Sequence, residues 1–423
     1  MSVDYEPLLP GHWADPYETY RKLRDEAPVY WAPKSELWCI SRYEDVAHVF
    51  RTPEDFSSEG ASEILVRRGR RLGLKDLMEI GRFMLASRIN PLIAMRGRDP
   101  SPMIISMDPP RHDALRSIVN RGFTPRRVQA WESRMKEIVE GCMARLSDDK
   151  PFDVVHDLAI PLPITVIAEV LGIETERRAQ FKQWSDDIIA SSTSGMDGIS
   201  IGKLLRAMGA LHRYLRGVVQ ERRRKPEDDV ISVLVDERQG APLDDREVAQ
   251  FVILLLIAGN ETTTNLIGNA TRALLDRPEV VSELNEQPEL VPAMIEEALR
   301  FDSPIQYLIR RVARDVEIAG TRLKKDSHVA VLVASANRDE RQFEDPDRFD
   351  IHRNTKGHLA FGLGVHFCLG ASLARLEARV ALEALVPELP HLERRDPETP
   401  LVQSLVVRGP STLPLVRTRA SAA

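Results

Sequence analysis

The spacing of apolar and polar positions is helical along most of the chain. Amphipathic or apolar segments of helical length predict helices at residues 15–26, 43–51, 126–146, 164–171, 175–190, 201–224 and 244–276. Short alternating or β-branched runs predict strands, at residues 29–31, 37–41, 316–318, 328–333, 405–407 and 413–416. The pattern therefore predicts a mainly α protein with small β-sheets. Residues 57–110 show no clear period, and loops of that length are usually functional or mobile.

The longest predicted helix contains a polar interruption. Asp244 and Glu247 have the spacing of a capping box, and a helix from there to Asp276 would be about 50 Å long. Its centre, residues 251–258, is apolar all round, which predicts burial on every side. Residues 259–264, Gly-Asn-Glu-Thr-Thr-Thr, follow directly, and burying them carries a desolvation cost. Either the helix leaves the core there, or it opens locally at Gly259 into a groove for a small ligand and a water.

One cysteine stands in a glycine-rich segment near the C-terminus, Phe361-Gly-Leu-Gly-Val-His-Phe-Cys-Leu-Gly370. A helical pattern follows, with charged residues interleaved among apolar ones. The loop thus delivers the sulfur of Cys368 to the start of a helix, where unpaired N–H groups and the helix dipole favour a thiolate. The glycines leave room for a flat cofactor and allow unusual φ values. A cysteine is more often a small buried hydrophobe, but a thiolate so placed suits an axial haem ligand.

Composition narrows the functional class. The 423 residues are 43% hydrophobic and 29% charged, as in an ordinary soluble protein, and the net charge of −6 gives no sign of nucleic-acid binding. Three widely spaced cysteines predict neither a disulfide framework nor a zinc site, and they suit a reducing cytoplasm. The acidic N-terminus has no signal-peptide pattern. The uninterrupted apolar run from Phe251 is shorter than a membrane span, so we expect a cytoplasmic protein without a membrane anchor.

The cysteine segment resembles the ligand loop of the cytochromes P450, the haem-thiolate monooxygenases, at each of its defining positions. The resemblance implies the cytochrome P450 fold, as a single triangular haem-enclosing domain over residues 1–423, and haem b held by Cys368. Ala258-Gly-Asn-Glu-Thr-Thr263 is similar to the oxygen-activation segment of that family. This similarity implies that Glu261 and Thr262 deliver protons and that Ala258 and Gly259 face the cofactor. Relatives that consume peroxide commonly lack the acid–threonine pair, so dioxygen activation with two supplied electrons is favoured.

Further residues take roles only through the resemblance. Glu297 and Arg300 match the Glu-x-x-Arg element, which implies a structural role in folding and haem retention. The haem propionates would be held by residues on three segments, which are His112, Arg116, Arg310 and His366. Arg311 is the weaker choice beside Arg310. Phe361 begins the cofactor-binding loop.

The resemblance also implies an apolar substrate pocket, with contributions from residues 57–102 and 191–199. The residues expected to line it are Leu254, Ala258, Ile305, Leu308 and Leu405, with Gln306 and Tyr307 as possible polar contacts. Such a pocket fits a terpenoid, steroid, fatty acid or polyketide-like molecule that the enzyme hydroxylates or epoxidises. Electrons would come from a ferredoxin or flavodoxin with its reductase, to a monomeric enzyme. The alternatives are a peroxide-driven peroxygenase, a haem isomerase, or a haem-based ligand sensor or carrier.

Overall fold

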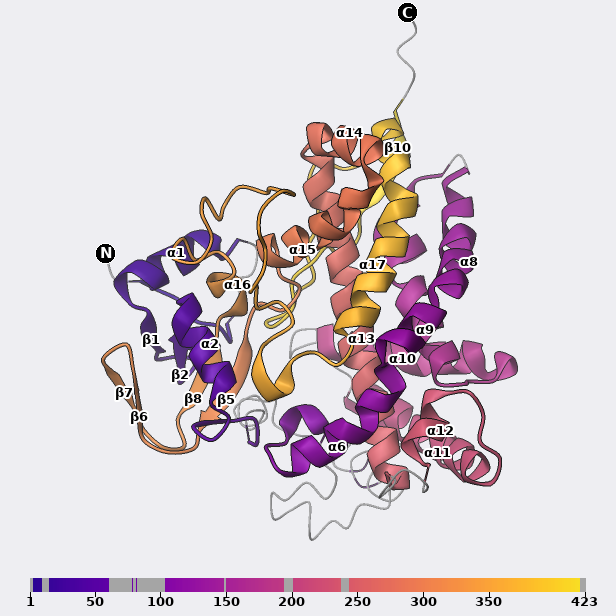
Figure 1. Ribbon diagram of the computed structural model, residues 1–423, viewed down its shortest axis with the longest axis horizontal. Coiled ribbons are helices and arrows are strands. Elements are labelled where there is room, and N and C mark those ends of the chain that lie inside the picture. The colour runs from indigo at the N-terminus through magenta and orange to yellow at the C-terminus, as the bar shows by residue number, and fades with distance from the viewer. Residues whose placement is uncertain are drawn as a thin grey trace, which may run out of the picture. The chain divides into compact units, whose positions relative to one another are not determined.

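The computed structural model describes residues 3–9, 15–60, 78, 81, 103–147, 150–193, 201–236 and 243–418 (Figure 1). Helices dominate these residues, as the sequence pattern predicts. The α-helices are α1 (Tyr17–Glu26), α2 (Tyr43–Arg51), α6 (Arg111–Val119), α7 (Pro125–Ala130), α8 (Glu132–Met143), α9 (Pro161–Val170), α10 (Arg178–Thr193), α11 (Ile201–Arg224), α12 (Val230–Leu234), α13 (Asp245–Leu275), α14 (Pro278–Glu286), α15 (Val291–Phe301), α16 (Val333–Ala336) and α17 (Ala371–Leu385).

The chain divides into two compact units, and α13 passes from one to the other. Unit 1 consists of residues 1–57, 128–163 and 262–423, and unit 2 of residues 58–127 and 164–261. The strands of the described residues all belong to unit 1. They are β1 (Val29–Ala32), β2 (Leu37–Ile40), β3 (Phe56–Ser57), β4 (Phe152–Asp153), β5 (Leu308–Val312), β6 (Val316–Ile318), β7 (Thr321–Leu323), β8 (His328–Val331), β9 (Leu392–Arg394) and β10 (Pro414–Arg417).

The largest sheet has the strand order β1-β2-β8-β5-β3 and is built mainly from antiparallel pairs. β2 and β8 are its parallel pair, with Cys39 opposite Ala330, and their side-by-side course is visible in Figure 1. β5 pairs antiparallel with β8, with Arg310 opposite Val329. The inner residues of this sheet pack with α2 in one apolar cluster that includes Val49, Phe50 and Val331. The sheet therefore fixes the position of Arg310 against a rigid core.

Several predicted elements differ in extent from the observed ones. The single helix predicted at residues 126–146 is two helices, α7 and α8, separated at Trp131. The strand predicted at residues 405–407 is wrong, because this segment forms only an isolated bridge between Val407 and Ile305. The predicted strand at 413–416 is confirmed as β10. Most of the irregular stretch from 57 to 110 lies outside the described residues, as does part of the segment 191–199.

The long helix α13 starts with the predicted capping box. The Asp244 carboxylate accepts from the backbone N–H of Glu247 at 2.8 Å, and the Glu247 carboxylate accepts from the N–H of Asp244 at 3.0 Å. The helix is continuous from Asp245 to Leu275, so the local opening predicted at Gly259 is not seen. Thr264 instead donates its hydroxyl hydrogen to the Ala159 carbonyl at 2.9 Å. α13 is long and apolar enough to cross a membrane, but 67% of its most apolar window is buried inside the protein, as in a core helix.

Candidate active site

Cys368 lies in the loop that leads into α17, as predicted. Its backbone N–H donates to the Phe361 carbonyl at 2.9 Å, which closes the segment from Phe361 to Cys368 into a compact turn. The side chain of Cys368 is half-buried. α17 begins three residues later, and its first turn includes a hydrogen bond from the Ala374 N–H to the Gly370 carbonyl at 2.8 Å. The thiol is thus held by backbone geometry at the N-terminal end of a helix.

The glycines of this loop serve two separate purposes. Gly362 and Gly364 have φ values of 69° and 73°, which other residues resist. A Cβ at Gly364 would also lie 2.4 Å from the Phe50 carbonyl oxygen. Gly370, in contrast, has no heavy atom within 4 Å of an added Cβ, so its missing side chain leaves open space beside the loop. The loop therefore offers both a fixed thiol and room for a flat group.

The centre of α13 is not buried on every side, and that prediction was wrong. Ala258 and Gly259 are exposed, and Leu254 and Thr262 are half-buried. These residues share one face of the helix because they are spaced by about one turn. A Cβ at Gly259 would meet nothing within 4 Å. An apolar helix centre thus has one open face, which ends at the half-buried Thr262.

Glu261, next to Thr262, has only 8% of its surface exposed. It therefore does not fit the interpretation that the helix leaves the core and solvates this acid. Within the polar interruption of α13, the buried Glu261 and the half-buried Thr262 stand at successive positions. Such an arrangement can hold and pass a proton at the open face of the helix.

Glu297 and Arg300 form a fully buried ion pair on α15. Two hydrogen bonds of 2.8 and 2.7 Å join the guanidinium to the carboxylate, and neither side chain is exposed. Arg300 also donates to the carbonyls of Asn337 and Pro346, and the Glu297 carboxylate accepts from the Asp350 N–H. These contacts join α15 to the segment that precedes the cysteine loop. Arg353 also contacts the Glu297 carboxylate, at 3.4 Å. A buried pair of this kind is costly to break, because removal of Arg300 would take away the closest cation of a buried carboxylate.

The four predicted propionate partners occur in both units. Arg310 in unit 1 is 7% exposed and lies 5.7 Å from the centre of the Phe50 ring, while Arg311 points outward to Asp326. His366 belongs to the short turn Gly364–His366 before Cys368. In unit 2, His112 and Arg116 lie one turn apart on α6, and His112 is buried. Arg310 is thus buried while Arg311 bonds to Asp326, and the two α6 residues lie on one helix face.

The predicted pocket residues of unit 1 come from two adjacent segments. Ile305 bridges to Val407, and the Gln306 N–H donates to the Val406 carbonyl at 2.8 Å. Ile305, Leu308 and Leu405 are all half-buried. Tyr307 and Gln306, which the sequence suggested as polar contacts for a substrate, bond to other parts of the protein. Tyr307 donates its hydroxyl hydrogen to the Pro7 carbonyl at 3.0 Å, and the Gln306 amide donates to the Ser303 carbonyl at 2.9 Å.

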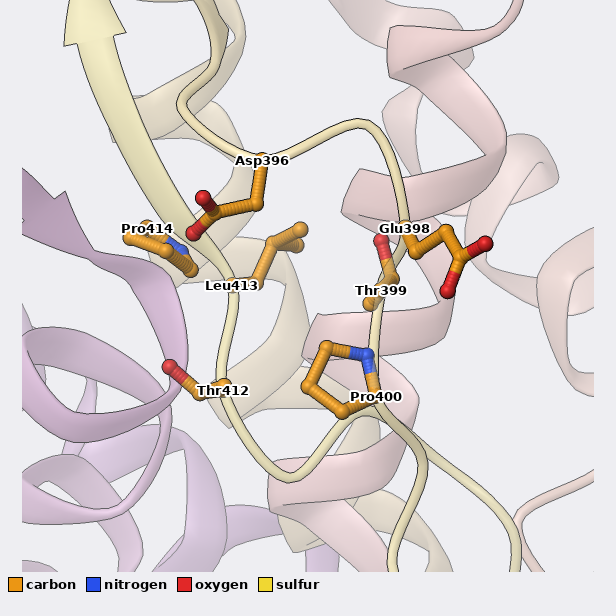
Figure 2. Close-up of a pocket in the computed structure, with 7 residues that line it drawn as sticks. All are labelled: Asp396, Glu398, Thr399, Pro400, Thr412, Leu413 and Pro414. Carbon is orange, nitrogen blue, oxygen red and sulfur yellow. The ribbon is translucent and has the colours of Figure 1, made fainter.

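A separate cavity of about 330 Å³ lies beside β10, between the segments 396–400 and 412–414 (Figure 2). None of its lining residues belongs to the cysteine loop, α13 or α15. Figure 2 shows the carboxylates of Asp396 and Glu398 directed to opposite sides, so they do not converge on one cation. This cavity therefore has no part in the site around Cys368.

Two acidic residues near the site carry contacts that the sequence analysis did not assign. Glu377 on α17 is 3% exposed, and burial raises the pKa of its carboxyl to about 8, against which a hydrogen bond with Thr263 acts only in part. Burial also raises the pKa of Glu296, but hydrogen bonds from Arg375 and His358 outweigh it and lower the pKa to about 2. The signal for Glu377 was its place on the apolar stripe of α17, one turn from Leu373 and next to Leu376.

Comparison with known proteins matches this chain to one family. The family model described as cytochrome P450 matches residues 86–415. The vitamin D(3) 25-hydroxylase of Pseudonocardia autotrophica is 38% identical over 95% of this chain and 94% of its own length. A solved cytochrome P450 from Chondromyces apiculatus is 40% identical, with a TM-score of 0.84 and full coverage of both chains. Another, from Bacillus megaterium in complex with corticosterone, is 35% identical, with a TM-score of 0.81 over 95% of this chain and 98% of that one.

Proposed function

Because the chain belongs to the cytochrome P450 family of monooxygenases, we propose that the sulfur of Cys368 is the axial ligand of a haem b iron. The observation that carries this assignment is the position of Cys368. The residue is half-buried, and the hydrogen bond from its backbone N–H to the Phe361 carbonyl fixes the loop around it. The other two cysteines, Cys39 and Cys142, lie on β2 and α8 and have no comparable loop.

The residues that we propose to hold the haem fit a flat, apolar group with two acidic substituents. Gly370 and Gly259 each leave space that a methyl group would fill. Phe367 in the same loop is 42% exposed, and its ring centre lies 6.4 Å from that of Phe361. Arg310, His366, His112 and Arg116 supply cations or hydrogen-bond donors for the propionates. Glu297 and Arg300 support folding and haem retention through the segment that they bind.

The chemistry of the reaction is divided between the cofactor and two residues of α13. A thiolate-ligated haem supplies dioxygen activation when two electrons are delivered from outside. Thr262 presents a hydroxyl on the open helix face, where it can donate a hydrogen bond. The buried carboxyl of Glu261 lies at the next position, where it can replace the proton that this hydroxyl passes on. Ala258 has only a methyl group and Gly259 has no side chain, so a small ligand can approach the helix backbone on this face.

We infer that the substrate is a hydrophobic small molecule of the terpenoid, steroid, fatty acid or polyketide-like class. Leu254, Ile305, Leu308 and Leu405 offer half-buried aliphatic surface. Gln306 and Tyr307 bond to other parts of the protein and offer no recognition group, which favours a largely apolar molecule. The named activity of the vitamin D(3) 25-hydroxylase and the corticosterone complex support a steroid-like skeleton. The electron donor would be a ferredoxin or flavodoxin with its reductase, in the cytoplasm, and the enzyme a monomer.

A panel of such compounds identifies ligands through the low-to-high-spin shift of the ferric Soret band. For a ligand so found, product formed with reductase and dioxygen is compared with product formed with hydrogen peroxide alone. We expect the reductase-driven rate to be at least about tenfold higher, because a positioned proton donor contributes factors of that size or more. Thr262→Ala should consume reductant while forming less product and releasing more peroxide, and Thr264→Ala serves as the matched control. Equal rates with peroxide, together with full coupling in Thr262→Ala, would contradict the proposal.

A further inference from the structure

A cluster of three polar side chains, Arg375, Glu296 and His358, lies beside the ring of Phe361. The backbone carbonyl of Phe361 accepts the hydrogen bond from the N–H of Cys368. The guanidinium carbon of Arg375 lies 4.4 Å from the centre of this ring. A cation over the face of an aromatic ring is attracted by its quadrupole. The first residue of the ligand loop, Phe361, therefore packs against a permanent positive charge on α17.

Arg375 is held in this place by Glu296 on α15. Its Nε donates to Oε1 of Glu296 at 2.6 Å, and its Nη2 donates to Oε2 at 2.8 Å. This two-point geometry fixes the plane of the guanidinium as well as its position. The side chains are 37% and 25% exposed, so water screens the pair only in part.

His358 is the third member of the cluster. Its Nδ1 accepts a hydrogen bond from the Ala360 N–H at 3.2 Å, so the ring proton resides on Nε2. Nε2 lies 3.0 Å from Oε2 of Glu296 and therefore donates to it. The ion pair of the cluster has one positive charge and one negative charge, and the positive charge lies over the ring of Phe361.

We propose that Arg375 and Glu296 act as positioning residues that set the reduction potential of the haem iron through Phe361 and the ligand loop. The inference rests on the proposed role of Cys368. Reduction adds one electron next to the thiolate, so a nearby positive charge favours the reduced state and a nearby negative charge opposes it. The ion pair balances these two effects, and loss of either partner leaves the other uncompensated.

Two neutralising variants test this balance, because they should move the potential in opposite directions. Arg375→Gln leaves the negative charge and lowers the potential, whereas Glu296→Gln leaves the positive charge and raises it. We expect each to change the one-electron reduction equilibrium by about threefold or more, which is about 30 mV. Arg375→Lys keeps the positive charge, so its change in reduction potential should be less than half of that shift. The measurement is a spectroelectrochemical titration of the purified haem-loaded protein without any electron-donor protein.

Arg379→Gln is the matched control, because Arg379 lies one turn further along α17 and pairs with Glu132 and Glu383 instead. Shifts of the two test variants in the same direction, or shifts no larger than that of the control, would overturn the inference. If Arg375→Gln does not fold, the sign of the Glu296→Gln shift decides alone. The reduced carbon monoxide spectrum is recorded for each protein. A wild-type spectrum without thiolate character would refute the ligand assignment, whereas unchanged potentials with thiolate character retained refute only the tuning role.

Discussion

The cysteine loop and the centre of α13 both contain a glycine that matters, but for opposite physical reasons. Gly364 has a φ of 73°, and a Cβ there would lie 2.4 Å from a backbone oxygen of Phe50. Gly259 is an ordinary helical residue whose added Cβ would meet no atom within 4 Å. The first glycine is required by the chain's own conformation. The second leaves space for a molecule that is not part of the chain.

The same contrast holds for the polar groups of the two regions. Around the loop, charges are engaged in pairs such as Glu297–Arg300 and Glu296–Arg375. On α13, Thr262 is half-buried at the end of the exposed face formed by Ala258 and Gly259. Substitutions near the loop should therefore reduce stability and cofactor retention, whereas substitutions on the α13 face should alter ligand binding and turnover with little loss of stability.

The largest effect is expected from Arg300→Ala. It leaves the buried carboxylate of Glu297 with only the longer contact of 3.4 Å to Arg353 as an ion pair, which should lower the free energy of unfolding by about 3 kcal/mol. Arg322→Ala removes a surface partner of Asp315, with side chains 75% and 47% exposed, and should cost less than about 1 kcal/mol. Urea unfolding of both variants measures the difference. Similar losses in the two would mean that the buried pair does not anchor the loop region.

Glu377 sharpens the comparison, because its carboxyl on α17 bonds to Thr263 on α13. Its pKa is raised to about 8 in the folded protein, from an ordinary value of 4.5 for an exposed glutamate. Between these values the folded state keeps a proton that the unfolded state has released, so this group's contribution to the free energy of unfolding falls as the pH rises. The fall is about 1.4 kcal/mol per pH unit and ends above about pH 8.

Glu377→Gln should remove this part of the pH dependence and make the variant relatively more stable at pH 8 than at pH 5. Urea unfolding of the wild type and the variant across this range is the measurement, with Glu388→Gln on the surface as control. Parallel stability curves for wild type and Glu377→Gln would show that the acid is not buried in its protonated form.

A smaller loss is expected from Gly364→Ala. The positive φ alone costs about 1–2 kcal/mol for a residue with a Cβ, and the approach to Phe50 adds to it. Gly320→Ala separates the two contributions, because Gly320 has a φ of 76° but open space around its added Cβ. In thermal unfolding, the melting temperature of Gly364→Ala should be well below that of Gly320→Ala. Equal melting temperatures would remove the close approach as a cause.

The smallest change in stability is expected from Gly259→Ala, which should gain about 0.5–1 kcal/mol because alanine favours a helix over glycine. Gly217→Ala on α11 should gain a similar amount, since its added Cβ also meets nothing within 4 Å. Only Gly259→Ala should weaken the substrate-induced spin shift. Equal ligand affinity in both variants would argue that the open face of α13 is not part of the ligand site.

Local sequence signals predicted contacts between residues close in the chain better than they predicted the exposed face of α13 or the long-range contacts. The capping box at Asp244 and Glu247, the cysteine loop before α17 and the Glu297–Arg300 pair all depend on residues close in sequence, and each lies where predicted. The open side of α13 could not be found this way, because a segment that is apolar all round has no periodicity to mark the exposed face. The contact between Glu296 and Arg375 joins residues far apart in the chain, so only the fold reveals it.

The identity of the iron ligand is tested most directly by the absorption spectrum of the reduced carbon monoxide complex. We expect the haem-loaded wild-type protein to show the red-shifted Soret band of thiolate ligation, and Cys368→His to bind haem but lose that band. Cys142→Ser should leave the spectrum unchanged. Retention of the red-shifted band in Cys368→His, or its absence from the folded wild-type protein, would contradict the central claim that the sulfur of Cys368 binds the iron.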